Sequence, residues 1–351
     1  MKVKAVAVAR KLNISKATVS LALNDKPGVS QQTKEAVLRC IEEMEQEGVT
    51  PSGQSQYSET KRYTPPISER YSTVRKQMIK IIIPNKWRTV IQNKDLDLMR
   101  ESLLVYDREA ARIGCVIGMS YIEMGTEDVP RIIEDSNSKE VAGVILYATD
   151  LKEEEIEEFK EIRKPMVIYD NEVESGWSCV NADNAGAVRR AVDLLAARGC
   201  KTIQYISADL DIYNFRKRRE GFLEGMRKNH LEIKENSILQ LENVYSDIKN
   251  YLHPGNLPDA LIMEEYHISL KVMQALADMG LHVSKDISLV GIDELPEYWM
   301  RDEYRLTTLK IEHAQRARAA IQLLEQEIQG TLTAKFKLFS ECSLNMGNSI
   351  R

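Results

Sequence analysis

The stretch from Asn13 to Ser30, NISKATVSLALNDKPGVS, most constrains what the first part of this chain can form. Ser15 is a good N-cap, because its hydroxyl can accept hydrogen bonds from the unpaired N–H groups at the start of a helix. Apolar residues then recur at helical spacing as far as Leu23, and residues 24–28, NDKPG, carry a dense turn signal. The stretch therefore predicts a short helix with a turn on either side.

Helical patterns flank this stretch. Apolar residues follow a helical spacing from Val3 to Leu12, and Ser30 can cap a third helix whose apolar face includes Ala36 and Val37. Three short helices with a tight turn before the second form the helix-turn-helix plan, in which the second helix presents its first residues to base edges in the major groove. We therefore predict an all-α helix-turn-helix DNA-binding head over residues 1–48.

The charge of the head agrees with contact to DNA. Residues 1–39 contain eight Lys and Arg and two Asp and Glu, a local net charge of +6 (8 − 2), whereas the whole chain has −5. Such a basic head indicates a phosphate-facing surface, because nonspecific affinity for DNA comes from these charges. Composition alone is equally compatible with a three-helix domain whose basic face is only solvated.

The order of residues in the head is more specific than its charge. The succession V-A, S-x-x-T-V-S, L-N-x-K-P-G-V-S and T-x-x-x-V resembles the N-terminal domain of the lactose-repressor (LacI/GalR) family. The residues that carry it are Val8-Ala9, Ser15, Thr18-Val19-Ser20, Leu23-Asn24, Lys26-Pro27-Gly28-Val29-Ser30, Thr33 and Val37.

This resemblance implies roles for single residues of the head. Lys16 and Ala17 match the base-reading positions at the start of the recognition helix. Leu21 stands where the family usually has an arginine; since leucine can make only apolar contacts, for example with a thymine methyl, the preferred operator should differ from the common one. The DNA-contacting residues predicted in this way are Lys4, Ser15, Lys16, Ala17, Thr18, Ser20, Leu21, Asn24 and Ser30.

Residues 49–76 have the composition of a linker, rich in Ser, Thr, Pro, Gly and Gln. In the lactose-repressor family, which the head resembles, this region contains a short hinge helix that inserts a leucine into the minor groove. Here residues 53–60 contain no Leu, Ile or Met, and Tyr57 is the only bulky wedge among them. We therefore predict a linker with an atypical hinge.

Beyond the linker, apolar runs of strand length alternate with amphipathic helical stretches in two successive series. This alternation predicts an α/β core of two doubly wound parallel-sheet halves over 77–351. The first half is expected at about 77–174 and 309–331, and the second at about 175–308 and 332–347. Because ligands of open α/β sheets bind outside the carboxyl ends of the strands, the cleft between the halves is the expected ligand site.

Three landmarks of the core resemble the periplasmic-binding-protein-like core of the same family: D-N-x-x-G at Asp183, R-x-x-G-F at Arg218 and G-x-D at Asp293. The resemblance implies that Arg218 grips the effector, and its planar fork suits paired hydroxyls or a carboxylate. A surface arginine is the plainer alternative, since Arg216 and Arg219 stand beside it. For each aromatic candidate, packing explains the residue as well as binding does. The predicted effector-binding residues are Arg218, Asn214, Tyr213, Glu265, Tyr266, Asp183, Trp299 and Trp87.

Several classes of protein lack support in the sequence. The five cysteines form no C-x-x-C pair and the five histidines no ligand spacing, so we expect neither a metal nor a cofactor. No P-loop, G-x-G-x-x-G, G-x-S-x-G or H-E-x-x-H motif supports an enzyme. No apolar run is long enough to span a membrane, and the N-terminus does not have the pattern of a signal peptide, so a cytoplasmic protein is expected.

The combined pattern predicts a transcription regulator. We expect a repressor that binds a palindromic double-stranded operator as a homodimer and responds to a small-molecule effector, sugar-like or other, in the cleft. Glu265 and Tyr266 replace the family's usual Asn-Asp, which weakens the expectation of an ordinary sugar. The alternative is a small-molecule sensor with a vestigial head, which the atypical hinge and Leu21 favour.

Overall fold

The computed structural model describes most of the chain, which forms two compact units, Met1–Ser72 and Thr73–Arg351. In the second unit, the core, it describes residues 77–85, 95–174, 176–253, 255–295 and 304–351, with only the backbone at 95–101. In the first unit, the head, it describes Val8, Thr18, Val19, Ala22, Thr33, Lys34, Ala36 and Val37.

All the described head residues are helical, as the predicted three-helix pattern requires. Val8, Val19 and Val37 are completely buried, so each of the three predicted helices contributes an apolar side chain to the interior. Ala36, which we expected on the buried face of the third helix, is exposed instead. The predicted linker over residues 49–76 lies outside the described residues.

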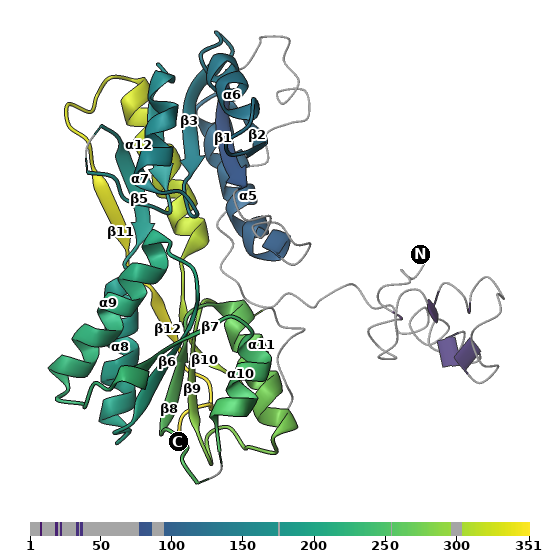
Figure 1. Ribbon diagram of the computed structural model, residues 1–351. Helices are drawn as coiled ribbons and strands as arrows, with labels where there is room; N and C mark the ends of the chain where they lie inside the picture. The colour runs from purple at the N-terminus through teal and green to yellow at the C-terminus, as the bar shows by residue number, and fades with distance from the viewer. Residues whose placement is uncertain are drawn as a thin grey trace. The chain divides into compact units, whose positions relative to one another are not determined.

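The core consists of two lobes, each built around one six-stranded sheet (Figure 1). The elements of lobe 1 are β1 (Met78–Asn85), α5 (Asp95–Arg112), β2 (Val116–Glu123), α6 (Asp128–Ser136), β3 (Val141–Tyr147), α7 (Glu153–Glu157), η1 (Glu158–Glu161), β4 (Met166–Tyr169), β5 (Ser178–Ala182), α12 (His313–Ile328) and β11 (Lys337–Ser340). The strand order is β11-β5-β4-β3-β1-β2, and all neighbours are parallel. Helices α5 and α12 cover one face of this sheet, and α6 and α7 cover the other.

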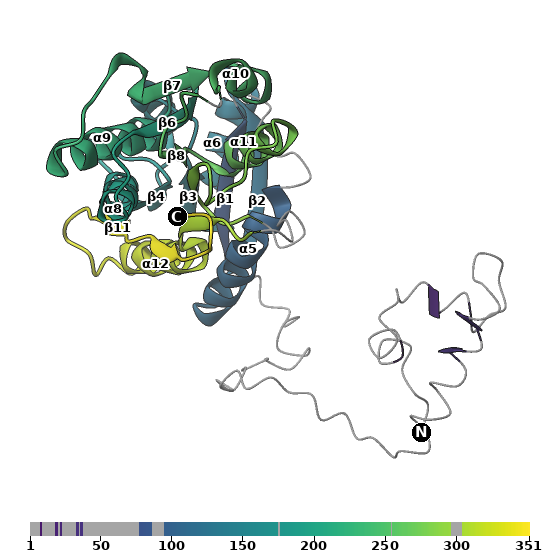
Figure 2. The ribbon, with the colours of Figure 1, turned by 90° about the horizontal axis from the view of Figure 1, so that it is seen from below.

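Lobe 2 repeats this plan. Its elements are α8 (Asn184–Ala197), β6 (Ile203–Ala208), α9 (Tyr213–Lys228), η2 (Glu235–Ser237), β7 (Ile238–Leu241), α10 (Val244–Tyr251), β8 (Ala260–Met263), α11 (Tyr266–Asp278), β9 (Ser288–Ile292), β10 (Thr307–Lys310) and β12 (Ser343–Asn345). The strand order is β12-β10-β9-β8-β6-β7, with only β12 antiparallel to its neighbour. Helices α8 and α9 lie on one side of the sheet, and α10 and α11 on the other (Figure 2).

Strand β1 shows why the sequence forms sheets that are covered on both faces. Its side chains alternate between two apolar clusters: Ile79, Ile81 and Ile83 pack toward α5 and α12, and Ile82 packs toward α6 and α7. A strand buried on both faces reads as a continuous apolar run, which is typical of parallel sheets. The predicted fold, a helix-turn-helix head followed by two α/β halves, is confirmed.

The predicted boundary between the halves was wrong at two strands. Residues 178–182 and 337–340, which we assigned to the second half, form β5 and β11 in the sheet of lobe 1. The physical reason is pairing: β5 follows β4 after a short loop and hydrogen-bonds beside it, and β11 then extends the same edge. The chain therefore crosses between the lobes after β5, between β10 and α12, and between β11 and β12.

Helices α8 and α9 pack so closely that one position admits only glycine. A Cβ atom on Gly221 would lie 2.1 Å from the main-chain oxygen of Ala185 and 2.7 Å from its Cα. Backbone atoms cannot move aside as a flexible side chain does, so the two helices would have to separate.

We expect Gly221→Ala to lower the free energy of unfolding by about 1–3 kcal/mol, the usual cost of overpacking a core. Urea denaturation followed by circular dichroism measures it. Gly255→Ala is the matched control, because nothing lies within 4 Å of a Cβ atom there. Equal stability of the two variants would contradict the close packing.

Among the described residues, no helix is long and apolar enough to cross a membrane. The described cysteines are buried free thiols: Cys115, Cys179, Cys200 and Cys342. Burial raises the pKa of each of these thiols, that of Cys342 to about 11. Thiols held in the neutral form are poor nucleophiles, which agrees with a structural role for these cysteines.

Candidate functional site

Helix α9 places Arg218 at the boundary between the lobes. Asn214, Arg218, Gly221 and Phe222 recur at helical spacing and form the buried face of the helix. Arg218 is only 6% exposed, whereas Arg216 is on the solvent side. The helical period therefore distinguishes between the neighbouring arginines, a choice that the sequence motif left open.

A chain of hydrogen bonds runs from lobe 1 into lobe 2, where it reaches Arg218. The Asn214 amide donates to the main-chain oxygen of Asp170 in lobe 1 (3.0 Å) and accepts from the Asn184 amide (2.8 Å). Arg218 donates its Nε–H to Asn184 Oδ1 (2.8 Å) and an Nη1–H to the main-chain oxygen of Glu264 (2.7 Å). We call these five residues the interlobe relay. Arg218 makes its two contacts within lobe 2, and Asn184 and Asn214 connect it to the main chain of lobe 1.

Asp170 occupies an unusual backbone position at the lobe 1 end of the relay. It follows β4 with φ of 68°, in the left-handed region that non-glycine residues seldom adopt. Its carboxylate forms an ion pair with Arg316 of α12 and accepts from the Thr149 hydroxyl (2.9 Å). The Arg316 guanidinium lies over the Tyr169 ring, 4.5 Å from its centroid. Strained residues of this kind cluster at ligand sites, where surrounding contacts maintain them.

Asp293 stands at the equivalent place in lobe 2. It follows β9, which has the same rank in its sheet as β4, and also has φ of 68°. Its Oδ2 lies 2.8 Å from His313 Nε2 at the start of α12, and its Oδ1 accepts from the N–H of Glu294. Burial alone would raise the pKa of Asp293, but His313, the Glu294 N–H and Arg218 together lower it. Asp293 is therefore an ionised group between the two lobes.

Two adjacent acids after β8 have different roles. The Glu264 carboxylate is completely buried and accepts from the Ser207 hydroxyl (2.7 Å) and the Ala208 N–H (3.1 Å). The Glu265 carboxylate caps α11 by accepting from the N–H groups of His267 and Ile268, both at 2.9 Å. Burial raises the pKa of both, that of Glu264 to about 7. The structure thus gives the predicted ligand residue Glu265 a local capping contact.

Three other predicted effector residues have local partners. Tyr266 is the first residue of α11, and its ring centroid lies 3.8 Å from that of His267. Asp183 caps α8 by accepting from the Gly186 N–H (2.8 Å). The Tyr213 hydroxyl donates to the Glu172 carboxylate of lobe 1, which also accepts from Lys337 (2.9 Å). Each of these contacts explains the residue without an effector.

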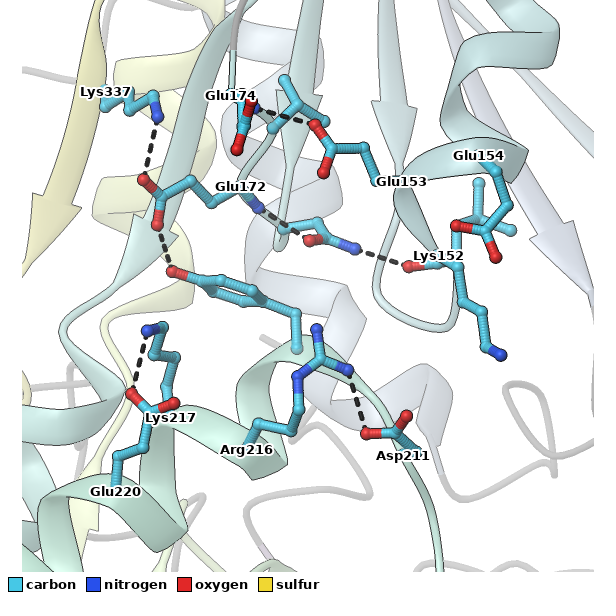
Figure 3. A pocket seen from close by; sticks show the side chains of 14 residues that line it. Lys152, Glu153, Glu154, Glu172, Glu174, Asp211, Arg216, Lys217, Glu220 and Lys337 are labelled. Atoms are coloured by element: carbon cyan, nitrogen blue, oxygen red, sulfur yellow. Dashed lines mark hydrogen bonds and ion pairs between the residues drawn. The ribbon is translucent and has the colours of Figure 1, made fainter.

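Tyr213 and Glu172 belong to a pocket of about 570 Å³ lined by both lobes, which we call the interlobe pocket (Figure 3). The loops after β3 and β4 form its lobe 1 side, and the start of α9 forms its lobe 2 side. Its charged side chains pair largely with one another, as Lys217 does with Glu220 and Arg216 with Asp211. The pocket lies along the outward face of α9, whereas the interlobe relay uses the inward face.

Sequence reasoning missed several residues at the boundary between the lobes. Arg316 left a signal, because it shares a helical face with the apolar residues Ala317, Ala320 and Leu324, where an arginine is out of place. Glu264 left none, since nothing in the sequence distinguishes its orientation from that of Glu265. The residues with defined contacts at this boundary that were not predicted to bind the effector are Asp170, Asn184, Glu264, Asp293, His313 and Arg316. Asn184 and Asp293 were found only as parts of the D-N-x-x-G and G-x-D landmarks.

The predicted residues outside the described part of the chain have no structural account. In the head, Thr18 is described as helical and half-buried. The predicted residues that lie outside the described ranges are Lys4, Ser15, Lys16, Ala17, Ser20, Leu21, Asn24, Ser30, Trp87 and Trp299.

Comparison with known proteins agrees with both parts of this architecture. The family described as "Bacterial regulatory proteins, lacI family" matches residues 7–46, and a periplasmic binding protein-like domain matches residues 192–350. The transcriptional regulator GalS of Salmonella typhimurium is 24% identical over 331 residues, which cover 93% of this chain and 90% of that protein. Catabolite control protein A of Priestia megaterium is 24% identical over 299 residues, which cover 82% of this chain and 81% of that protein.

Solved structures share the fold over nearly the whole length. The lac repressor dimer bound to operator and the anti-inducer ONPF has a TM-score of 0.64 and 19% identity, and the match covers 99% of each chain. The complex of the transcriptional regulator CelR with cellobiose has a TM-score of 0.65 and 19% identity, and the match covers 99% of this chain and 100% of that one.

A helix-turn-helix head joined to a two-lobed periplasmic-binding-protein-like core defines a class of DNA-binding regulators with an effector-binding domain. The chain belongs to the LacI family of bacterial transcriptional regulators. Members of this family bind DNA operators and small effectors such as sugars, and they are not enzymes.

Proposed function

We propose that this regulator is a cytoplasmic repressor that binds a palindromic operator as a homodimer and is controlled by a small effector bound between its lobes. The observation that carries the proposal is the interlobe relay from Asp170 through Asn214, Asn184 and Arg218 to Glu264. A ligand that prefers one lobe arrangement shifts the population toward it, and that shift is what the heads would sense.

The effector class follows from how charges pair around the relay. Arg316 pairs with Asp170, and Asp293 lies against His313, so Arg316, Asp170 and Asp293 already have partners. Arg218 makes its hydrogen bonds to neutral oxygens and has further N–H groups to offer. We infer a small neutral effector with several hydroxyl groups, which accept such donors without adding a charge. The CelR structure contains cellobiose, a molecule of this kind.

The surface of lobe 1 supports a dimer. Strand β2 is the outer strand of its sheet, and Tyr121 on it is 50% exposed. Leu104 on the neighbouring helix α5 is 61% exposed. Exposed large apolar side chains beside an open strand edge favour association with a second copy of the chain. The lac repressor that shares this fold is a dimer in its operator complex.

Selection of binding sites from random duplex DNA by the full-length protein tests the proposal. We expect an enriched palindrome, because two heads related by a two-fold axis read two inverted half-sites. The promoter that carries this sequence then indicates the effector's pathway. Absence of any enriched sequence, or of a salt dependence of DNA affinity, would instead support the sensor with a vestigial head.

Within that selection, Lys16→Ala is expected to change the base preferred at one half-site position, because a base contact contributes about 1–3 kcal/mol of discrimination. Lys11→Ala is the matched control, because it removes one positive charge of the basic head outside the predicted base-reading positions and should weaken binding evenly for all sequences. If Lys16→Ala selects the same sequence as the unmodified protein, Lys16 does not read bases.

A further inference from the structure

Glu264 is the least exposed charged residue of the interlobe relay. Its main-chain oxygen accepts from Arg218, while its carboxylate holds the Ser207 hydroxyl and the Ala208 N–H at the end of β6. Residues 209–212 connect the end of β6 to α9, the helix that carries Arg218. Glu264 therefore fixes Arg218 at two points: at the guanidinium itself and at the segment from which its helix starts.

The surroundings of Glu264 do not complete its hydrogen bonding. Its Oε1 is buried without a hydrogen bond among the described residues, and its ion pair with Arg219 Nη1 is 3.6 Å long, beyond hydrogen-bond distance. An ionised carboxylate needs donors at both oxygens, whereas a neutral carboxyl needs fewer. A buried oxygen without a donor is costly, and more so when it carries charge. The geometry therefore suits the neutral carboxyl better than the carboxylate.

We propose that Glu264 is a positioning residue for Arg218, and that it holds the start of α9 firmly while its carboxyl is neutral and less firmly once it is ionised. The charged and titratable groups that face it are Arg218 and Arg219 from α9 and Tyr205 from β6. Arginine side chains stay charged in proteins. Burial, and next the charge of Glu264, raise the pKa of Tyr205 well above its usual value, so Tyr205 also stays neutral there. The change of charge near neutral pH thus belongs to Glu264.

The sign of the effect follows from linkage. Burial raises the pKa of Glu264 from 4.5 to about 7, so the stabilising contribution is complete below pH 4.5 and is lost as the pH rises through 7. Any local opening that brings Glu264 to water is therefore favoured when the pH rises. The position of the effector-binding arginine, and with it effector affinity, becomes sensitive to pH around neutrality.

The test measures hydrogen exchange of the Arg218 Nε–H by NMR in the full-length protein without effector or DNA, with the resonance assigned by its loss in Arg218→Lys. Exchange is compared between the unmodified protein and Glu264→Gln, which keeps a side-chain acceptor but cannot ionise. Glu224→Gln is the matched control, because it changes an exposed glutamate of α9, the helix that carries Arg218. Taking the ratio of rates at each pH removes the ordinary pH dependence of exchange.

We expect the ratio of the exchange rate of the unmodified protein to that of Glu264→Gln to rise by at least about tenfold between pH 5.5 and pH 8, as the linkage of a raised pKa requires. Glu224→Gln should match the unmodified protein at both pH values. A ratio that does not change with pH would overturn the proposal, because a merely structural role predicts a constant ratio.

The inference rests on the proposed role of Arg218 in binding the effector. Because the measurement uses neither effector nor operator, failure of the proposed function would show in the DNA selection and not in this ratio.

Discussion

Arg218→Ala is expected to weaken effector binding about 100-fold while the heads still bind the operator. Each hydrogen bond from a charged group is worth roughly 1.5–3 kcal/mol, and about 1.4 kcal/mol corresponds to a factor of ten in affinity. The loss of two such bonds to the ligand therefore accounts for an affinity about 100-fold weaker. Fluorescence anisotropy of labelled operator DNA, followed as effector is added, measures both the binding and its response.

The same substitution also leaves Asn184 Oδ1 and the Glu264 main-chain oxygen without their donor. Arg227→Ala is the matched control, because Arg227 lies exposed in the last turn of the same helix. The control should respond to effector as the unmodified protein does. If Arg218→Ala responds normally while the operator is bound, the ligand does not contact Arg218 and the proposed site is incorrect.

Arg316→Ala is expected to have the largest effect on stability, a loss of about 3–5 kcal/mol in the free energy of unfolding. Removing one partner of a buried ion pair leaves the other charge without compensation, and a cost of this order follows. Arg316 is 1% exposed, pairs with Asp170 and lies over the Tyr169 ring. Without the guanidinium, Asp170 keeps its left-handed backbone and its charge but loses the main contact that offsets both.

Urea denaturation of the full-length protein, followed by circular dichroism, gives the midpoint of unfolding and the slope of its free energy with urea concentration. Arg318→Ala is the control on the same helix, because Arg318 is more exposed and its ion pair with Glu109 should contribute less than about 1 kcal/mol. The double change of Arg316→Met with Asp170→Asn should recover part of the loss, since no buried charge remains unpaired. Equal destabilisation by Arg316→Ala and Arg318→Ala would contradict this account.

The positions of helices and strands could be predicted because the lobes obey simple periodicities. The amphipathic stretch that forms α9, Tyr213–Lys228, and the apolar run that forms β1, Met78–Asn85, both follow these periodicities. Strand β7, Ile238–Leu241, was missed, because it is short and only half-buried at a sheet edge and so has no continuous apolar run. Which sheet β5 joins was also beyond prediction, since a strand has the same pattern whichever sheet it joins.

Residues of the candidate site could be predicted only where a sequence motif and the helical period together indicate which side chains face inward. Arg218 was found through its motif, and the burial of its helical face then separated it from Arg216 and Arg219. Glu264 was not found, because the orientation of a side chain just after a strand depends on contacts distant in sequence, such as those with Ser207 and Ala208. Asp170 and Asp293 both find their partners on α12. Arg316 is more than a hundred residues from Asp170 in the sequence, and His313 is about twenty residues from Asp293.

The repeated crossing of the chain between the lobes has a consequence for the order of synthesis. Strands β11 and β12 complete the outer edges of the two sheets, yet they are made after every other strand. Until residues 337–345 have left the ribosome, β5 and β10 each present an open edge of unpaired N–H and C=O groups. The head, encoded first, is available to fold early, as N-terminal domains do. A nascent chain therefore carries a finished DNA-reading head while both sheets of its sensor are still open to misassembly.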